Sequence, residues 1–137
     1  MADIEIGHTF LDFKAISYQG EKPKYFITMS NADDFGDEFA CFVMNTERRK
    51  NKYVLNCNKS AQKFVIAPNT FSFVINYTSI MLSRPCIYKY EEIFETSIKL
   101  LDIAPNKLCR QIKNCIDWNY IQIKITNLIK DAFRSYP

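Results

Sequence analysis

Apolar and polar residues alternate along the first two thirds of the chain, and this alternation predicts β-strands. Successive side chains of a strand point to opposite faces of the sheet, so every second residue of a half-buried strand is apolar. Residues 24–30 follow this rule, whereas residues 38–46 are apolar on both faces, as is typical of a central strand covered from both sides. The predicted strands span residues 4–13, 24–30, 38–46, 53–57, 63–67 and 70–83, the last with room for a bend midway.

Near residue 88 the spacing of apolar residues changes to that of helices. A short helix is predicted from residue 88 to about 101, with three glutamates favouring its N-terminal end. A longer helical face begins at Pro105, because proline is favoured in the first turn of a helix. Residues 120–125 also alternate as in a strand, but we favour two consecutive helices with a break near residues 117–119.

This order of elements predicts an α+β fold. Short strands that form a small, SH3-like, strongly bent antiparallel β-barrel, finished by C-terminal helices over its open side, would account for the pattern. A chain of 137 residues, of which 47% are apolar, can fill one core. We therefore expect a single domain over 1–137, with a β-rich barrel over about 4–83 and a helical part over about 88–134.

Composition narrows the cellular setting. The first residues lack the basic start and the apolar run of a signal peptide, and no segment approaches the roughly 18 apolar residues of a membrane-spanning helix. We therefore expect a cytoplasmic protein that does not associate with a membrane. The five cysteines are odd in number and lack CxxC spacing, which makes reduced, partly buried thiols the default expectation. Since His8 is the only histidine, no zinc site can be assembled locally, and we expect no metal and no cofactor.

Charge is distributed unevenly along the chain. Residues 1–47 carry three lysines and nine acidic residues, a balance of −6, whereas residues 48–137 carry fifteen basic and six acidic residues, a balance of +9. A surface formed by the second part could hold a polyanion such as a nucleic acid. The competing interpretation is that these basic side chains are the solvated sides of strands and helices.

Common catalytic signatures are absent: the sequence contains no GxGxxG, P-loop, GxSxG or HExxH motif. Four segments nevertheless follow one another in an order known from one protein family. The first is a predicted strand that begins near Gly7, and the second is a loop with Lys22-Pro23 before a predicted strand. The third is a predicted strand that ends in Thr46, and the fourth is Ser72 before an apolar run. They span residues 6–13, 20–31, 42–46 and 70–76. In this order of parts, from residue 6 to about residue 116, the sequence resembles the MazF/PemK-like endoribonuclease toxins.

The resemblance implies a metal-independent, sequence-selective endoribonuclease that cuts single-stranded RNA by attack of the RNA 2′-hydroxyl group. It also implies a homodimer and an antitoxin protein as partner. The sequence departs from the family at the arginine before proline, which is Lys22, and at the acidic residue after the first glycine, which is His8. The Asp/Glu-Gln pair of the family's late strand falls on Tyr77-Thr78. A barrel that has lost its catalytic groups and binds RNA or a protein partner is therefore the alternative, and an interaction or inhibitor protein unrelated to RNA is a third.

Within the nuclease hypothesis, Lys22 could stabilise charge on the phosphate and Thr46 could donate a hydrogen bond to it. Glu21, His8 or Asp12 could take the 2′-hydroxyl proton if the fold brings one of them close. Each residue also has an ordinary structural role open to it: a solvated lysine, a threonine that caps a turn, or a histidine satisfied beside a strand bulge.

RNA binding is predicted for a basic loop that directly follows Thr46 and for neighbouring side chains. Phosphate groups would contact lysine and arginine, and unpaired bases would stack on tyrosine. The candidates are Lys24, Arg48, Arg49, Lys50, Lys52 and Tyr18, with Tyr25, Phe35 and Tyr53 as further stacking residues. The alternative is a solvated hairpin loop flanked by aromatic residues of the core.

Overall fold

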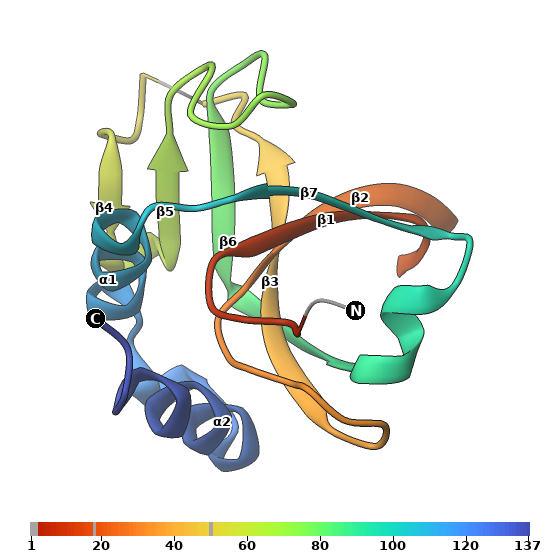
Figure 1. Cartoon of the computed structure of the whole chain (residues 1–137). Coiled ribbons are helices and arrows are strands. Elements are labelled where there is room, and N and C mark those ends of the chain that lie inside the picture. The colour runs from red at the N-terminus through yellow and green to blue at the C-terminus, as the bar shows by residue number, and fades with distance from the viewer. Residues whose placement is uncertain (1–2, 18, 50) are drawn as a thin grey trace.

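Seven antiparallel strands form one strongly curved sheet (Figure 1). The computed structural model describes residues 3–17, 19–49 and 51–137. The strands lie side by side in the order β4-β5-β6-β3-β2-β1-β7. They are β1 (His8–Ser17), β2 (Gly20–Thr28), β3 (Glu38–Thr46), β4 (Asn56–Asn58), β5 (Lys63–Ile66), β6 (Thr78–Lys89) and β7 (Ile98–Ile103).

The two edges of the sheet stay apart. Among the described residues, β4 pairs only with β5 and β7 pairs only with β1. The predicted α+β class, with antiparallel strands followed by C-terminal helices, is therefore confirmed, but the sheet is not closed into a barrel.

Strand β3 has the predicted bounds and lies between β2 and β6 at the middle of the sheet. Its residues 39–42 have no exposed surface. Successive side chains enter two different cores: Phe39 and Cys41 belong to one, and Ala40 and Phe42 belong to the other. The prediction of a central strand covered on both faces is confirmed.

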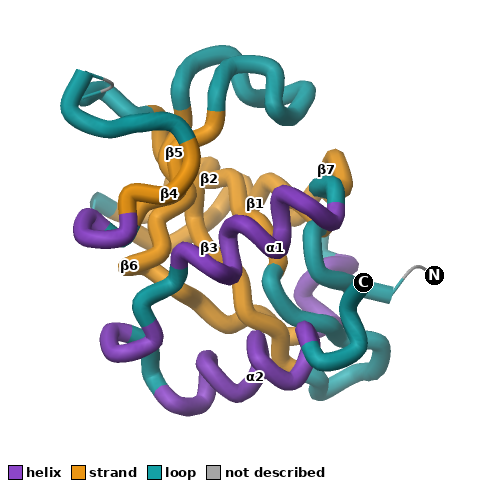
Figure 2. The backbone as a smooth tube through the Cα atoms, turned by 90° about the vertical axis from the view of Figure 1, so that its left-hand side faces the viewer, coloured by secondary structure: helices purple, strands orange, loops and turns teal. Residues whose placement is uncertain are grey.

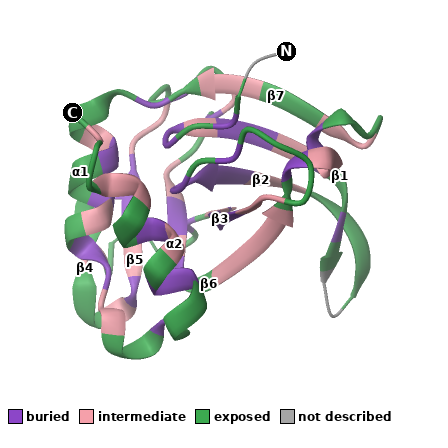
Figure 3. Ribbon diagram, turned by 60° about the horizontal axis from the view of Figure 1, so that its bottom comes forward, coloured by how far each residue is buried: buried purple, intermediate pink, exposed green. Residues whose placement is uncertain are grey.

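Two C-terminal helices, α1 (Asn106–Cys115) and α2 (Ile123–Phe133), cover one face of the sheet (Figure 2). Their inward side chains, such as Ile112 and Ile129, share a core with Phe42 and Ile80. Figure 3 shows the helices exposed on their outer sides and buried toward the strands. None of the helices in the described part of the chain is long and apolar enough to cross a membrane.

The opposite face carries the second core, which is rich in aromatic rings. Phe10, Phe26 and Phe39 pack there with Tyr90 and Ile93. The last two belong to a 3-10 helix, η2 (Tyr90–Phe94), which covers this face at the right of Figure 1. Two further 3-10 turns are η1 (Lys59–Ala61) and η3 (Trp118–Tyr120).

The predicted pair of C-terminal helices is confirmed. Pro105 directly precedes α1, and the predicted break falls at Asp117, whose side chain accepts a hydrogen bond from the Asn119 N–H at 3.1 Å. That bond begins η3 rather than continuing α1. The strand-like alternation of residues 120–125 is overridden, because α2 begins at residue 123.

The predicted helix over residues 88–101 is wrong. Strand β6 continues to Lys89, where it pairs with Glu38, and only the short η2 follows. Residues 98–103 form the edge strand β7, because antiparallel pairing with β1 satisfies their backbone hydrogen bonds. The other late prediction, one strand over residues 70–83, is also incorrect in its first half, which is a series of turns before β6.

The expectation of reduced thiols throughout is wrong for two of the five cysteines. Cys57 of β4 and Cys115 at the end of α1 form a disulfide across a sequence separation of 58. Cys41, Cys86 and Cys109 are free thiols. The bond ties one edge strand of the sheet to the helical layer.

Candidate nucleic-acid interface

The loop between β3 and β4 presents the basic residues that were predicted to bind RNA. Arg48, Arg49 and Lys52 are all exposed. Lys50 and Tyr18 fall outside the described residues. Residues 48–90 contain no aspartate or glutamate, and they build this loop together with β4, β5 and β6. We call Arg48, Arg49 and Lys52 the basic loop. The absence of acidic residues from 48 to 90 is a sequence signal for this surface, and the net charges of the two parts of the chain do not show it.

A buried carboxylate holds the base of the basic loop. Glu47 is only 7% exposed. One of its oxygens accepts a hydrogen bond from the Arg49 N–H at 2.9 Å. The other accepts hydrogen bonds from Lys63 Nζ at 3.0 Å and from Ser79 Oγ at 2.5 Å. Because Lys63 neutralises Glu47, the nearest acidic group does not offset the exposed cations of the loop.

This network predicts a pH-dependent contribution to stability. Burial alone raises the pKa of Glu47, but hydrogen bonds from Ser79, Arg49 and Lys63 together hold the pKa below its ordinary value. A carboxylate whose pKa is lower in the folded than in the unfolded protein stabilises the fold above its unfolded pKa, about 4.3. That stabilisation is lost as the pH falls through the folded-state pKa.

We expect Glu47→Gln to lower the free energy of unfolding at pH 7 by about 2 kcal/mol, because it removes the charge from three hydrogen bonds. The difference from the wild type should be smaller at pH 3 than at pH 7, since a larger share of the native carboxyl groups is protonated at the lower pH. Urea unfolding at both pH values checks this. The exposed Glu21 offers the matched control, and Glu21→Gln should change stability little at either pH. Equal losses at pH 3 and pH 7 would contradict the role of the charge.

Two tyrosines line a hollow beside the basic loop. The hollow has a volume of about 370 Å³ and is lined by Asn51, Tyr53, Leu55, Val65 and Tyr77. Lys63 Nζ lies 4.5 Å from the centre of the Tyr53 ring, and Lys52 Nζ lies 5.7 Å from it. An aromatic ring flanked by cations and an amide group offers both stacking and hydrogen bonding to a nucleobase.

Lys22 and Thr46, two of the predicted catalytic residues, lie on opposite faces of the sheet. In the β2–β3 register Tyr25 pairs with Met44, so Lys24 reaches Asn45, to which its Nζ donates a hydrogen bond at 2.9 Å. Thr46 is the next residue and points the other way. Lys22 and Lys24 line a hollow of about 800 Å³, whereas Thr46 lines another of about 250 Å³.

His8 and Glu21, the other two predicted catalytic residues, do not join either group. His8 begins β1, and Lys22 pairs with Ala15 seven residues further along that strand, roughly 20 Å away at about 3.3 Å per residue. Burial lowers the pKa of His8 and favours its neutral form. Glu21 is exposed and follows the opposite alternation from Lys22.

The 800 Å³ hollow, which we call the mouth pocket, is formed by β1, β2, β3, β6 and the segment around η2. Asp12, the third predicted proton acceptor, lines it together with Lys22 and Lys24. One Asp12 oxygen accepts a hydrogen bond from the Tyr88 hydroxyl at 2.6 Å and the other accepts one from the Lys14 N–H at 2.9 Å. Burial and the neighbouring Asp12 raise the pKa of Tyr88, so this hydroxyl stays protonated and donates.

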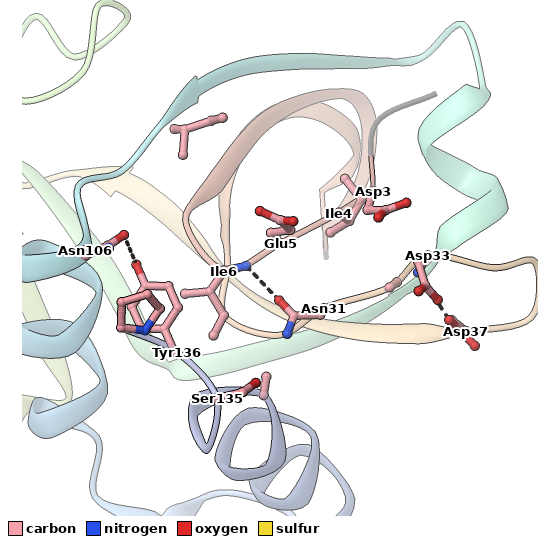
Figure 4. Close-up of a pocket in the computed structure, with 14 residues that line it drawn as sticks. Asp3, Ile4, Glu5, Ile6, Asn31, Asp33, Asp37, Asn106, Ser135 and Tyr136 are labelled. Atoms are coloured by element: carbon pink, nitrogen blue, oxygen red, sulfur yellow. Dashed lines mark hydrogen bonds between the residues drawn. The ribbon is translucent and has the colours of Figure 1, made fainter.

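An acidic hollow lies at the other end of β3 from the basic loop. It has a volume of about 500 Å³ and is bordered by Asp3, Glu5, Asp33 and Asp37 (Figure 4). A hydrogen bond with Asp37 raises the pKa of Asp33. The described residues hold no group of three or more His, Cys, Asp or Glu side chains suited to a metal ion, and the expectation of no cofactor stays a prediction. The acidic side chains of this hollow therefore lie at one end of β3 and the basic loop lies at the other. The acidic hollow repels a polyanion, whereas the basic loop attracts one.

No protein-family model, curated protein or solved structure matches this chain. The resemblance to the MazF/PemK-like toxins therefore stays a prediction from the order of four sequence segments.

Proposed function

We propose that this protein binds single-stranded RNA through the basic loop and the adjoining tyrosine hollow. The observation that carries the proposal is the position of the exposed Arg48, Arg49 and Lys52 beside a hollow lined by Tyr53 and Tyr77. Cations that neutralise phosphates supply most of the affinity for a nucleic acid, and aromatic rings add stacking that tolerates any base sequence.

A single strand fits this arrangement better than a duplex. The hollow is small and lies beside a loop, so it suits one unstacked base, and a duplex keeps its bases stacked. The preference for RNA over DNA comes from the resemblance to endoribonuclease toxins.

The proposal is binding without turnover. The cleavage mechanism predicted from the sequence needs Lys22, Thr46 and a proton acceptor such as His8 within hydrogen-bond reach of one phosphate. Lys22 and Thr46 lie on opposite faces of the sheet. His8 begins β1, whereas Lys22 pairs with Ala15 near the other end of that strand. Endoribonuclease activity, an SH3-like relationship, a homodimer, an antitoxin partner and a cytoplasmic location stay predictions.

Replacement of Arg48, Arg49 and Lys52 by alanine should weaken the binding of a fluorescently labelled single-stranded RNA roughly 100-fold, at about 1 kcal/mol for each lost phosphate contact. The slope of log K against log salt concentration should become shallower by about two, since each phosphate contact with a single strand contributes about 0.7. Fluorescence anisotropy over a series of salt concentrations measures both quantities.

The matched control removes the same charge from the C-terminal part of the chain. Lys107, Arg110 and Arg134 are exposed and also comprise two arginines and one lysine. Their replacement by alanine should change the affinity no more than about twofold. Equal weakening by both triple substitutions would mean that net charge alone attracts RNA, and a wild type without affinity would overturn the proposal. RNA cut in EDTA, with cutting lost in Lys22→Ala and Thr46→Ala, would instead support the nuclease prediction.

A further inference from the structure

Two free thiols face each other across the middle of the sheet. Cys41 of β3 and Cys86 of β6 are direct partners in the antiparallel register, so their side chains lie on the same face. Their Sγ atoms are 3.3 Å apart and not bonded. A small movement would therefore bring the two sulfur atoms to bonding distance.

Access to the two sulfur atoms differs. Cys41 has no exposed surface, whereas Cys86 is half-buried and lines the mouth pocket. Burial and the hydrogen bond with Cys86 raise the pKa of Cys41 well above its ordinary value. A reagent that enters the pocket therefore meets Cys86 first, with Cys41 directly behind it.

The lining of the mouth pocket carries charges of both signs around an apolar floor. Lys22, Lys24 and Arg84 contribute positive charge, and Asp12, Glu92 and Glu95 contribute negative charge. Phe26 and Val43 line the pocket beside Cys86. A ligand that matches this lining carries carboxylate and ammonium groups together. The volume, about 800 Å³, is within the usual range for small-molecule sites.

We propose that Cys86 is a thiol-modification site for zwitterionic, amino-acid-derived disulfides such as glutathione disulfide, and that Cys41 resolves the adduct. The Cys86 thiol loses its proton, and its sulfur attacks one sulfur of the ligand. A bond between Cys86 and one glutathionyl group forms, the ligand disulfide breaks, and the released thiolate takes up a proton.

The second step closes the protein disulfide. The raised pKa of Cys41 keeps its thiolate scarce, but the 3.3 Å between the two Sγ atoms of the unmodified protein favours the attack once that proton is lost. The Cys41 thiolate attacks the Cys86 sulfur, and the bound glutathionyl group leaves as a thiolate that takes up a proton to give a second thiol. Two protein thiols are thereby oxidised to one disulfide, and one ligand disulfide is reduced to two thiols. This inference uses none of the residues of the basic loop, so it stands independently of the proposed RNA binding.

The test is to incubate the folded wild type with glutathione disulfide, quench with acid, and determine intact mass and peptide map. We expect a Cys41–Cys86 disulfide in the wild type, one glutathionyl group retained on Cys86 in Cys41→Ala, and neither product in Cys86→Ser. Cys109→Ala, which removes a buried thiol elsewhere, should react as the wild type does. If Cys41→Ala fails to fold, the wild-type peptide map and Cys86→Ser still decide the question.

The ligand class is tested with a neutral disulfide, bis(2-hydroxyethyl) disulfide, as the matched probe. Lys24→Ala and Arg84→Ala should each slow the reaction with glutathione disulfide about two- to fivefold and leave the rate with the neutral probe unchanged. A folded wild type unmodified at Cys86 would overturn the site. Equal effects of the substitutions on both probes would overturn the assignment of the pocket to zwitterionic ligands.

Discussion

Loss of the Cys57–Cys115 disulfide should lower the free energy of unfolding by about 4 kcal/mol. The bond closes a loop across a sequence separation of 58, and it joins the edge strand β4 to the end of α1. Without the bond, the conformational entropy of the unfolded chain increases, and this increase is larger for a longer loop. Urea unfolding of the wild type and of Cys57→Ser measures the difference; because Cys57 is exposed, the serine hydroxyl is not buried.

Reduction of the wild type supplies the control for this substitution. Dithiothreitol should destabilise the wild type by about the same amount as Cys57→Ser does, and it should leave the variant unchanged. A wild type equally stable with and without reductant would contradict the predicted contribution of the bond.

Phe10→Ala should lower the free energy of unfolding by about 4 kcal/mol, since it leaves a cavity at the centre of the aromatic core. Phe10 has no exposed surface. Its ring stacks on that of Phe26 with 5.1 Å between centres, and it meets the edge of Tyr88, also at 5.1 Å. The substitution removes both ring pairs in addition to the buried apolar area. Chemical unfolding followed by tyrosine fluorescence measures the loss.

Phe13 provides the comparison within the same strand. It lies three residues further along β1 and is 47% exposed. Phe13→Ala should therefore cost only about 0.5 kcal/mol, because little apolar area returns to water. Similar losses at Phe10 and Phe13 would show that the aromatic core is less well packed than the ring distances indicate.

Where the local pattern was unambiguous, the sequence predicted the fold well. Strand β3 is apolar on both of its alternating faces, a pattern typical of a central strand, and its predicted bounds agree with the structure. The break between the C-terminal helices was also correct, because Asp117 favours the start of a new turn. Both features depend on neighbouring residues, which is the information that a single sequence carries.

Features that depend on distant residues were missed. The apolar residues of β7 have a spacing that also suits a helix, and only the pairing of Ile98 with Asp12 and of Ile103 with His8 makes the segment a strand. The partners of the disulfide are likewise far apart in sequence, so no spacing rule could have paired Cys57 with Cys115.

The candidate site divides in the same way. Arg48, Arg49 and Lys52 are close in sequence, and their positive charge was evident from the chain alone. The network around Glu47 joins the loop after β3 to β5 and β6, and it could not be inferred from the sequence. The predicted catalytic residues rest on the order of the sequence segments. The pairing register decides on which face of the sheet a side chain lies, and it separates Lys22 from Thr46.

The position of β3 between two cores has a consequence for how the protein denatures. Phe39 and Cys41 complete the aromatic core, while Ala40 and Phe42 complete the core beneath the helices. Disorder in this one strand would remove part of both cores at once, so neither half can melt and leave the other intact. We expect a single cooperative transition, in which the fluorescence of Trp118 on the helical side and the near-ultraviolet dichroism of the aromatic core change together.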